Sequence, residues 1–533
     1  MSQERLDRIN KLDQLRSFGI ISYINKFNKK QNIVDLLDKD GDTFRAIEDI
    51  ISSPNDGYKT AGRLTLFRSH GKLSFAKLLD ETGEIQLMFH RDNCKISAGG
   101  DIYVDILTAD SEEISAYKIM EKLVDVGDWI GVEGELFMTH KWELTLFVHK
   151  FTILSKAIRP LGDKFHGIWD DQENAYRQRY LDMIFNRDTL ERIKLRSLFI
   201  KTIREFYWSQ WFMELETPIL GNAASGAAAK PFITHHDDFD LEMYLRISPE
   251  TNLKKATVGM VEKIFEIGKQ FRNEWSDPSH HQEFTSIEHY AVYWNHEDNM
   301  DFTEKMFDYI FDNIPTLNRT ISVPDKQWNI KDVSFQTPRP RIDYIEQIQK
   351  DSGIDVSIYH EWDEDKLRSD IKNQWHTRED IEKQWLITMI DYLYKKVTRP
   401  KIIWPAFIVN YPKLMQPLAR ISDKDNQIVE QRQLLINGRE VIKAYSELVD
   451  PIIQQSNFDK QALALAAGDE EATSGDPDFV LAMEYGMPPQ SWWGMWVDRI
   501  FALLTEQSNI RDVILFPMMK PLNNTLDVSG EEI

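Results

Sequence analysis

The chain has 533 residues, which is too many for one hydrophobic core, so the sequence predicts two or three domains and excludes a lone small module. Hydrophobic residues make up 42% and charged residues 28% of the sequence, a balance typical of globular proteins rather than disordered or fibrous ones. The 64 basic and 86 acidic residues give a net charge of −22, which argues against a surface that binds nucleic acid over its whole extent but allows a local basic patch.

Other classes of protein are excluded by what the sequence lacks. Its single cysteine, Cys94, excludes a disulfide framework and a multi-cysteine zinc site, and we interpret it as a structural thiol. No apolar run approaches the ~18–20 residues that a membrane span needs, and the first residues are charged rather than signal-like. We therefore expect a cytoplasmic protein with no membrane partner. The adjacent His280 and His281 do not predict a metal site, because neighbours in a polar turn cannot easily face one ion.

Residues 1–57 predict a helical N-terminal extension. Apolar residues recur at helical spacing from Leu12 to Ile24, and the segment ends at a turn that contains Gly57. Nothing in it suggests chemistry, so we interpret it as an appendage docked on the surface.

Residues 58–155 change to a period of two. Five short runs alternate apolar and polar residues and are bounded by glycine-containing turns, as the strands of a small barrel require. We therefore predict a five-stranded OB-type β-barrel over these residues. The runs are GRLTLFRS, KLSFAKLLDE, GEIQLMFH, DWIGVEGELFMTH and WELTLFVHKFTIL.

A linker over 156–180 leads to a larger α+β region over 181–530. Its strand-like runs alternate and have hairpin-sized connections, which favours an antiparallel sheet flanked by helices over a doubly wound parallel sheet. No Rossmann or P-loop phosphate-binding motif is present. The polar stretch at about 316–400 is interpreted as a helical insertion. Helices are predicted at 187–209 and 300–313, and strands at 242–247, 283–293, 406–410, 434–449 and 512–516.

Charged residues gather around a predicted turn between two strands. Arg272 and Glu274 lie in this turn, Glu283 follows it, and the second strand carries Glu288 and Tyr290. The planar guanidinium of arginine suits phosphate or carboxylate recognition, although an isolated Arg–Glu pair is more often a structural salt bridge.

Two further charged groups follow in order along the predicted sheet. Glu440 and Glu447 lie near the two ends of one strand, and Asp498-Arg499 begins a predicted helix. Isolated acidic residues on strands usually face solvent. The ordered occurrence of all three groups on one antiparallel sheet favours a shared pocket instead.

With these groups, the chain resembles bacterial-type class II lysyl-tRNA synthetases from about residue 58 to 525. The segments that carry the resemblance are Phe212–Pro218, Phe271–Glu274 and Asp498-Arg499, which resemble the three class II motifs, and Phe165–Gly167, Tyr176–Asp182 and Ala229–Thr234. The resemblance implies an enzyme that joins L-lysine to the α-phosphate of ATP and then passes the lysyl group to tRNA(Lys).

The resemblance also implies roles for individual residues in ATP binding. Arg272 would hold the α-phosphate and the lysine carboxylate, Glu274 the adenine amino group, and Arg499 the γ-phosphate, so Arg272 and Arg499 are the predicted catalytic residues. A displacement of this kind needs positioning and charge neutralisation more than a protein nucleophile.

The lysine substrate implies buried carboxylates. Glu250 matches the position that binds the α-amino group, and Glu447 with Tyr290 matches the positions that bind the ε-ammonium. Tyr445 and Arg272 complete the predicted lysine site. A carboxylate at 447 favours lysine over aspartate or asparagine, which would need a cationic or amide partner.

The resemblance implies Mg²⁺ bound together with the ATP phosphates. Glu440 matches a magnesium-binding carboxylate, and such ligation is usual for this ion. Gln433 stands where a second carboxylate is expected, and Lys443 and Val449 stand where the family commonly has asparagine. An amide oxygen at Gln433 can still coordinate metal without adding charge.

The barrel is implied to read the tRNA anticodon. Arg68, Phe75, Gln86 and Glu143 match the family's anticodon readers, with Phe75 stacking on a base and the others reading base edges. A purely structural role in the core is the alternative for Phe75. The segment Phe212–Pro218 implies a homodimer, because this motif packs at the subunit interface in the family.

Five tryptophans stand where the family has glycine, in a chain with 15 tryptophans and only 24 glycines. A turn glycine commonly takes φ > 0, which an indole-bearing residue tolerates poorly. We hypothesise that the source decodes as glycine a codon read here as tryptophan. If the tryptophans are genuine, the alternative is a catalytically impaired tRNA-binding paralogue. The five are Trp142, Trp211, Trp275, Trp492 and Trp496.

A third reading is a synthetase-like enzyme that lysylates a translation factor. Relatives of that kind lack the barrel that this chain has, so the sequence favours the tRNA ligase.

Overall fold

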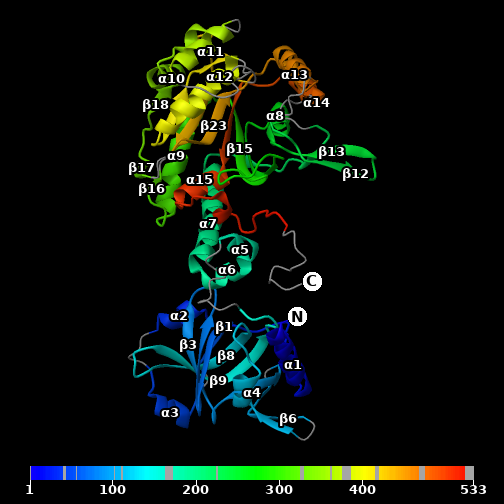
Figure 1. The fold of residues 1–533 in the computed structure, drawn as a ribbon. Helices are drawn as coiled ribbons and strands as arrows, with labels where there is room; N and C mark the ends of the chain where they lie inside the picture. Colours follow the sequence, from blue (N-terminus) through cyan, green and yellow to red (C-terminus); the bar gives the residue numbers. More distant parts are fainter. Residues whose placement is uncertain are drawn as a thin grey trace. The chain divides into compact units, whose positions relative to one another are not determined.

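The computed structural model describes residues 2–39, 44–55, 57–100, 102–109, 112–161, 172–223, 226–227, 229–324, 329–359, 363–374, 386–413, 419–466 and 475–521. Two compact units are present, Met1–Asn174 with Pro521–Ile533, and Ala175–Lys520, and each is described by itself (Figure 1). The segment Phe165–Gly167 lies outside the described residues. Within those described, no helix combines the length and apolar character needed to cross a bilayer.

The first unit contains a closed barrel of five strands. Antiparallel ladders join β3 to β2, β2 to β1, β1 to β8 and β8 to β9, and a parallel ladder between β9 and β3 closes the ring. Alternate residues of β2, namely Ser74, Ala76 and Leu78, are fully buried. The predicted barrel is confirmed. Its strands are β1 (Tyr58–His70), β2 (Leu73–Leu79), β3 (Glu84–His90), β8 (Trp129–Met138) and β9 (Leu144–Ser155).

Short elements between β3 and β8 complete this unit. The helix α4 places Tyr117, Ile119 and Met120 in the barrel core, and Ser115 caps its first turn by accepting a hydrogen bond from the Lys118 amide. The elements are β4 (Lys95–Gly99), β5 (Ile102–Val104), β6 (Ile106–Ala109), β7 (Glu112–Ser115) and α4 (Ala116–Lys122).

The predicted N-terminal helix is shorter than expected, because a glycine ends it. Gly19 has φ +75, and the Ile20 amide donates to the Leu15 carbonyl at 3.0 Å, which is the Schellman arrangement of a helix C-terminus. The prediction of helical structure through Ile24 is therefore wrong: the Ile24 amide instead bonds to the Leu154 carbonyl beside β9. The helices are α1 (Gln3–Ser17), α2 (Ile33–Leu37) and α3 (Ile47–Ser52).

The second unit contains an eight-stranded sheet in the order β10-β14-β15-β24-β23-β22-β19-β18. The ladders from β14 to β19 are antiparallel, and only the edge strands β10 and β18 pair in parallel. The predicted antiparallel sheet is therefore confirmed. Its strands are β10 (Met213–Glu214), β14 (Lys263–Phe271), β15 (Glu283–Val292), β24 (Gln490–Trp496), β23 (Arg439–Ser446), β22 (Gln431–Ile436), β19 (Ala406–Val409) and β18 (Arg341–Asp343).

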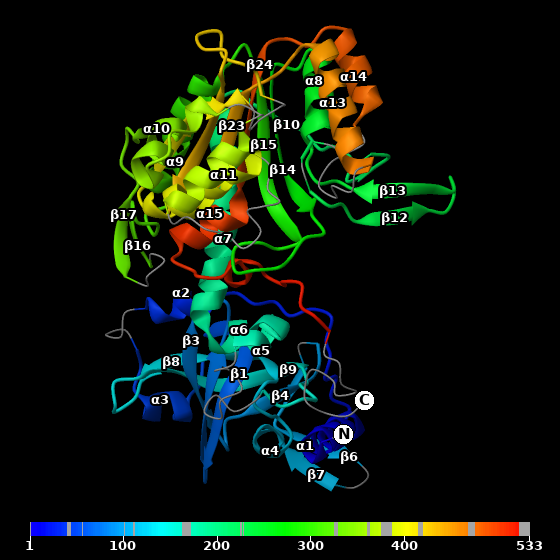
Figure 2. The same ribbon diagram turned by 45° about the horizontal axis from the view of Figure 1, so that its top comes forward.

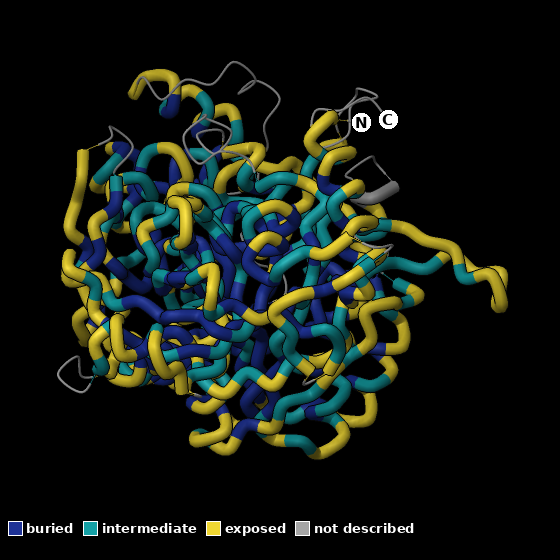
Figure 3. Tube along the Cα trace, turned by 90° about the horizontal axis from the view of Figure 1, so that it is seen from below, coloured by how far each residue is buried: buried dark blue, intermediate teal, exposed yellow. Residues whose placement is uncertain are grey.

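Three helices, α7 (Arg187–Ser209), α9 (His296–Asn313) and α15 (Val497–Leu504), cover one face of this sheet (Figure 2). In α7, Phe199, Ile203 and Phe206 recur at helical spacing in the core, which also takes Ile287 of β15 and Trp493 of β24. Figure 3 colours the trace by burial, with buried residues in dark blue and exposed segments in yellow.

The insertion predicted at 316–400 is not wholly helical. It begins with a hairpin of β16 (Thr320–Pro324) and β17 (Ile330–Ser334), and β18 then joins the main sheet. Ile321 and Val323 alternate inward and pack on the core beneath α15. The helical part comprises α10 (Tyr344–Ser352), η2 (Val356–Ile358), α11 (Glu364–Asn373), α12 (Leu386–Leu393), η4 (Tyr394–Thr398) and η5 (Arg399–Lys401).

Two strand predictions need correction. The run 434–449 is a hairpin, not one strand, because Asn437 and Gly438 have φ of 51° and 64° and turn the chain between β22 and β23. The run 512–516 forms no strand: η7 (Ile510–Val513) is a 3₁₀ turn, capped by the Asn509 side chain, which accepts from the Arg511 amide at 3.0 Å.

The remaining elements surround the sheet. The hairpin of β12 and β13 projects from the unit (Figure 1). The remaining elements are α5 (Gln172–Arg177), α6 (Arg179–Phe185), β11 (Leu220–Gly221), β12 (Ile233–His236), β13 (Leu241–Leu245), α8 (Glu250–Val258), β20 (Tyr411–Pro412), β21 (Ile428–Val429), α13 (Pro451–Ala466) and α14 (Pro477–Glu484).

Candidate active site

The face of the sheet opposite α7, α9 and α15 carries the predicted site. On β15, Ile287 and Ala291 belong to the helical core, whereas Glu288 and Tyr290 alternate with them and face the other side. Tyr290 packs with Leu253 of α8, which brings the start of that helix onto the same face.

Two predicted lysine-binding acids meet on this face around an ammonium. The Nζ of Lys254 lies 2.6 Å from Glu250 Oε1 and 2.7 Å from Glu447 Oε2. The Tyr445 hydroxyl donates to Glu250 Oε1 at 3.2 Å. All four side chains are buried. Lys254 reaches Glu250 because it lies one turn later on α8.

Two carboxylates share this single ammonium, which can neutralise the charge of only one of them. Although burial disfavours the charged form, Glu250 and Glu447 raise the pKa of Lys254 above its ordinary value. Burial raises the pKa of Glu447 against the attraction of Lys254. Glu447 Oε1 and the Tyr290 hydroxyl have no hydrogen-bonding partner among the described residues. The site is thus able to accept a further cationic donor.

Glu288 extends this group of acids. It accepts hydrogen bonds from Ser248 Oγ at 3.1 Å and from Trp492 Nε1 at 2.9 Å. Burial, and then the nearby Glu250 carboxylate, raises the pKa of Glu288 to about 7. We refer to Glu250, Lys254, Glu288 and Glu447 as the acid cluster.

A stack of rings and guanidinium groups lies on the same face. The Trp496 indole is parallel to the Phe284 ring, with centroids 4.3 Å apart and 8° between the planes. The Arg499 guanidinium lies 4.2 Å from the indole centroid. Since Phe284 covers one face of the indole at contact distance, Arg499 must occupy the other. We call the space between Phe284 and Arg499, which Trp496 fills, the ring slot.

Arg272 borders both parts of the site. Its guanidinium lies 5.1 Å from the Trp496 ring centroid, and its Nε donates to the Ile247 carbonyl at 3.3 Å. Burial lowers the pKa of Arg272, and the Glu288 carboxylate most strongly opposes this shift. Arg272 therefore connects the ring slot to the acid cluster, and with Arg499 it supplies the positive charge that a polyphosphate needs.

The start of α15 is fixed by a residue pair that the sequence reasoning missed. Asp498 accepts from the Thr285 amide at 2.8 Å and forms an ion pair with Arg196 of α7. Arg499 then donates to the Glu440 carbonyl at 2.6 Å, and burial lowers its pKa to about 10. The pairing of Arg196 spans three hundred residues of sequence, so no local pattern could have predicted it.

A β-bulge places Glu440 on the site face. Leu434 pairs with Ile442 while Leu435 pairs with Glu440, so Val441 is an extra residue in β23. Glu440 thereby joins the face that carries Lys443 and Tyr445. Burial lowers the pKa of Lys443, and Glu440 most strongly opposes this shift.

The predicted magnesium ligands differ in how well they fit an ion. Glu440 is half-buried on the site face, as a carboxylate that shares Mg²⁺ with phosphates should be. Gln433 Oε1 already accepts hydrogen bonds from the hydroxyls of Tyr411 at 2.7 Å and Tyr394 at 3.3 Å. Within the described ranges, no three His, Cys, Asp or Glu residues could together hold a metal ion. The fit therefore rests on Glu440.

Two charged residues predicted near the turn lie at its rim. Glu274 is exposed, and its electrostatic partner is Arg272. Glu283 forms a salt bridge with Lys269 at 3.3 Å with 42% of its side chain exposed. Glu283 thus forms a structural salt bridge and does not join the other predicted site residues.

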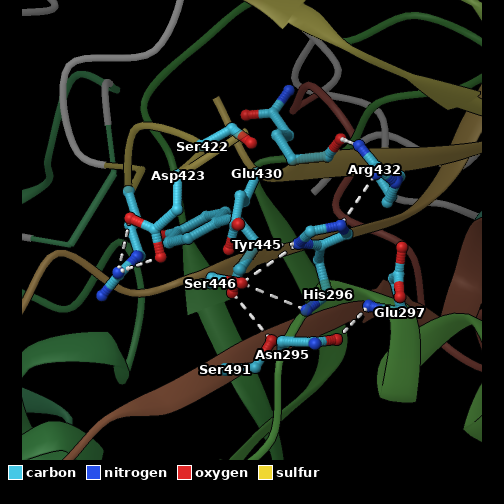
Figure 4. Close-up of polar contacts among 12 residues, drawn as sticks. Asn295, His296, Glu297, Ser422, Asp423, Glu430, Arg432, Tyr445, Ser446 and Ser491 are labelled. Carbon is cyan, nitrogen blue, oxygen red and sulfur yellow. Dashed lines mark hydrogen bonds and ion pairs between the residues drawn. The ribbon is translucent and has the colours of Figure 1, made fainter. Parts of the chain in front are cut away.

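A polar network gathers around Ser446, the residue between Tyr445 and Glu447 (Figure 4). Arg432 donates to His296 Nε2 at 2.7 Å, and His296 Nδ1 lies 3.1 Å from Ser446 Oγ and 3.4 Å from Glu430 Oε2. The hydrogen bond from His296 lowers the pKa of Glu430. The network fixes the strand end between the two site residues and was not predicted.

Three of the predicted anticodon residues share the outer face of the barrel. Arg68 lies opposite Phe75 across β1 and β2, and Lys77 lies opposite Gln86 across β2 and β3. Gln86 Nε2 donates to Thr145 Oγ1 at 2.8 Å. Because Phe75 and Lys77 alternate with the buried residues of β2, this face points away from the barrel core.

The fourth residue, Glu143, approaches the same face. The Glu84 hydrogen bond and, more weakly, the Glu143 charge raise the pKa of Lys77. Phe75 is half-buried and packs against a buried apolar cluster that contains Ile50 of α3 and Phe147 of β9. Its ring therefore has a structural contact and an accessible part.

Comparisons with known proteins agree with these two regions. Residues 171–520 match the family described as tRNA synthetases class II (D, K and N), and residues 58–154 match the OB-fold nucleic acid binding domain. The lysine–tRNA ligase of Carboxydothermus hydrogenoformans is 37% identical over 96% of this chain and 97% of its own. That of Thermotoga maritima is 38% identical over 96% and 95%. That of Lactococcus lactis is 37% identical over 96% and 97%.

Proposed function

Because the chain belongs to the class II tRNA synthetases of the aspartate, lysine and asparagine group, with an OB-fold domain before the catalytic one, we propose that it is a lysine–tRNA ligase. It uses ATP to activate L-lysine as lysyl-adenylate and then transfers the lysyl group to tRNA(Lys), in protein synthesis.

The choice of lysine rests on the acid cluster, and this observation carries the proposal. A buried pair of carboxylates with one shared ammonium and an unpartnered Glu447 Oε1 favours a second cation. In the proposal Glu447 and the Tyr290 hydroxyl bind the ε-ammonium, and Glu250 binds the α-amino group with support from Tyr445. Aspartate or asparagine would leave these buried acids uncompensated.

The activation step is a displacement at phosphorus. A lysine carboxylate oxygen attacks the α-phosphorus, the bond to the bridging oxygen breaks, and pyrophosphate leaves with the electron pair. Arg272 neutralises the carboxylate and the α-phosphate, and Arg499 binds the γ-phosphate, which are the roles that phosphoryl chemistry needs from a protein. Glu274 faces the adenine edge from the rim.

Magnesium would be held by Glu440 together with the phosphates and would supply charge neutralisation. The role of Gln433 stays a prediction, since its amide oxygen already accepts two hydroxyls.

The barrel is proposed to bind the anticodon of tRNA(Lys). Its outer face offers a half-exposed aromatic ring, Phe75, beside the polar groups of Arg68, Gln86 and Glu143. Such a combination suits single-stranded bases. We further infer a cytoplasmic homodimer that uses the segment Phe212–Pro218, in which Met213 is 49% exposed.

Lysine-dependent exchange of pyrophosphate into ATP tests the proposal. It is measured on the full chain as printed and on a five-glycine chain, in which Trp142, Trp211, Trp275, Trp492 and Trp496 are replaced by glycine. We expect exchange with lysine and none with aspartate or asparagine. A folded five-glycine chain that binds tRNA but shows no exchange would favour the impaired paralogue.

A further inference from the structure

The ring slot is already full, and this bears on whether the printed chain can bind a nucleotide. Trp496 touches Phe284 on one face and Arg499 on the other at ring-contact distances of 4.3 and 4.2 Å. No second flat ring fits between either pair without displacing the indole. Yet without the indole, the Phe284 ring and the Arg499 guanidinium would present two flat groups between which a base could stack.

Trp492 fills the neighbouring part of the same face. Its ring centroid lies 4.7 Å from that of Tyr445, and its Nε1 donates to Glu288. A Cβ built on Gly494 would lie 2.6 Å from the Trp492 ring, so the indole lies flat along its own strand. Trp492 thus lies beside the acid cluster, and Trp496 fills the ring slot on the same side of β24.

The indoles of three other tryptophans bury little apolar surface. Trp142, Trp211 and Trp275 are 86, 87 and 95% exposed. Trp142 and Trp211 also take φ of 58° and 67°, the left-handed region. An exposed indole recovers no burial energy to offset the strain of that conformation.

The end of α7 allows a comparison within the chain. Trp211 occupies the residue after the C-cap, where the Phe212 amide bonds to the Tyr207 carbonyl at 3.1 Å. Gly19 occupies the same place at the end of α1. Met260 also takes positive φ, so this conformation alone does not demand glycine. The strained backbone at 142 and 211 is thus weaker evidence for glycine than the indole of Trp496, which fills the ring slot.

We propose that residue 496 decides whether the nucleotide base can enter the ring slot, and that the working protein carries glycine there and at 142, 211, 275 and 492. The source would then decode as glycine the codon that is rendered as tryptophan in the printed sequence. This inference rests on the proposed use of ATP. Glycine in place of tryptophan at these positions would open the ring slot without changing any charged residue.

The first test measures ATP binding to the purified full chain by equilibrium dialysis with Mg²⁺ present. Trp496→Gly opens the slot, whereas Trp496→Phe keeps a flat ring in it and serves as the matched control. We expect Trp496→Gly to bind ATP about 10- to 100-fold more tightly than the printed chain, as gain of a base stack implies, and Trp496→Phe to bind no better. Trp496→Ala provides a second open variant if glycine weakens β24.

Equal ATP affinity of the printed chain and of both open variants would overturn the inference while leaving the ligase proposal intact. A five-glycine chain that binds ATP tightly but gives no lysine-dependent exchange would support the inference about the ring slot and contradict the ligase proposal. The second test is peptide mass spectrometry of the protein isolated from its source. Peptides with glycine at 275 and 496 are expected, and an indole at 496 would overturn the proposed decoding.

Discussion

The acid cluster and the ring slot lie on one face of one sheet, yet they differ in what satisfies them. In the acid cluster the protein supplies a cation, Lys254, which compensates its carboxylates only in part. In the ring slot the protein supplies a whole flat ring, Trp496, between Phe284 and Arg499. The acid cluster can therefore still bind a cation, whereas the ring slot has no room for a second flat group.

This difference separates charge from shape as sources of specificity. Buried charge cannot be satisfied by packing alone, so the acid cluster selects a cation even in the free protein. A stacking site accepts any flat group that fits, including one from the chain itself. A single substitution can therefore close the slot without any effect on the cluster.

Loss of Lys254 should disturb the acid cluster most. Lys254→Met leaves the buried carboxylates of Glu250 and Glu447 without their shared cation. We expect the free energy of unfolding to fall by about 3–5 kcal/mol, measured by urea denaturation at neutral pH. Lys255→Met is the matched control, because Lys255 pairs with the exposed Asp478. Its effect should stay below about 1 kcal/mol. If both variants lost the same free energy of unfolding, the Lys254 ammonium would not be needed to compensate the buried acids.

Removal of one acid should affect lysine rather than ATP. Glu447→Gln in the five-glycine chain deprives the ε-ammonium of its partner, and kcat/KM for lysine in pyrophosphate exchange should fall by roughly 10²- to 10³-fold. ATP affinity should change little. Glu283→Gln, at the rim, serves as the control and should retain activity. A Glu447→Gln enzyme with unchanged lysine dependence contradicts the assignment.

Removal of a guanidinium should show the reverse pattern. Arg499→Ala in the five-glycine chain should lower kcat by about 10²- to 10³-fold with little change in lysine affinity, because the lost group neutralises phosphate. Arg499→Lys should not rescue it, since an ammonium lacks the planar fork and stacks poorly. Full activity of the Arg499→Lys enzyme would show that the positive charge at this position is sufficient and that the planar guanidinium is not needed.

The pH dependence of stability should distinguish the two regions further. Glu288 has a pKa of about 7 in the folded chain against an ordinary value of 4.5, so the folded chain keeps a proton that the unfolded chain loses between these values. The resulting stabilisation is complete below pH 4.5 and is lost as the pH rises through about 7; it amounts to about 3 kcal/mol.

Urea denaturation between pH 4.5 and 7 measures this contribution in the ligand-free chain. Glu288→Gln cannot titrate, so its stability should fall less steeply than that of the parent over this range. An identical slope in parent and variant would mean that Glu288 is already ionised in the folded chain.

The smallest expected effect concerns the barrel. Phe75→Leu keeps an apolar side chain against the cluster that contains Phe147 but loses the ring. Binding of tRNA(Lys) should weaken by about 1–3 kcal/mol in a filter-binding assay, whereas pyrophosphate exchange should be unchanged. Unchanged tRNA affinity would favour the structural role for Phe75.

Periodicity predicted the elements whose burial repeats along the sequence. The alternation in β2 and the helical spacing of Phe199 and Ile203 in α7 each reflect one buried face. The prediction failed where one residue decided the outcome, as Gly19 does at the end of α1. It also failed in the insertion, where only Ile321 and Val323 mark the strand β16.

The site residues likewise divide into those that the sequence could predict and those that it could not. Family motifs pointed to Arg272, Glu447 and Arg499, but Glu440 and Glu447 are an odd number of residues apart and would lie on opposite faces of a regular strand. Only the bulge at Val441 brings them to one face, and no sequence signal announces it. Lys254 could have been found, because it follows Glu250 at helical spacing.

The most direct test of the central claim is a crystal structure of the five-glycine chain with L-lysine and a non-hydrolysable ATP analogue. We predict that the ε-ammonium lies between Glu447 and the Tyr290 hydroxyl, and the adenine between Phe284 and Arg499. Lysine bound with its ε-ammonium away from Glu447, or an adenine outside the slot although residue 496 is glycine, would contradict it.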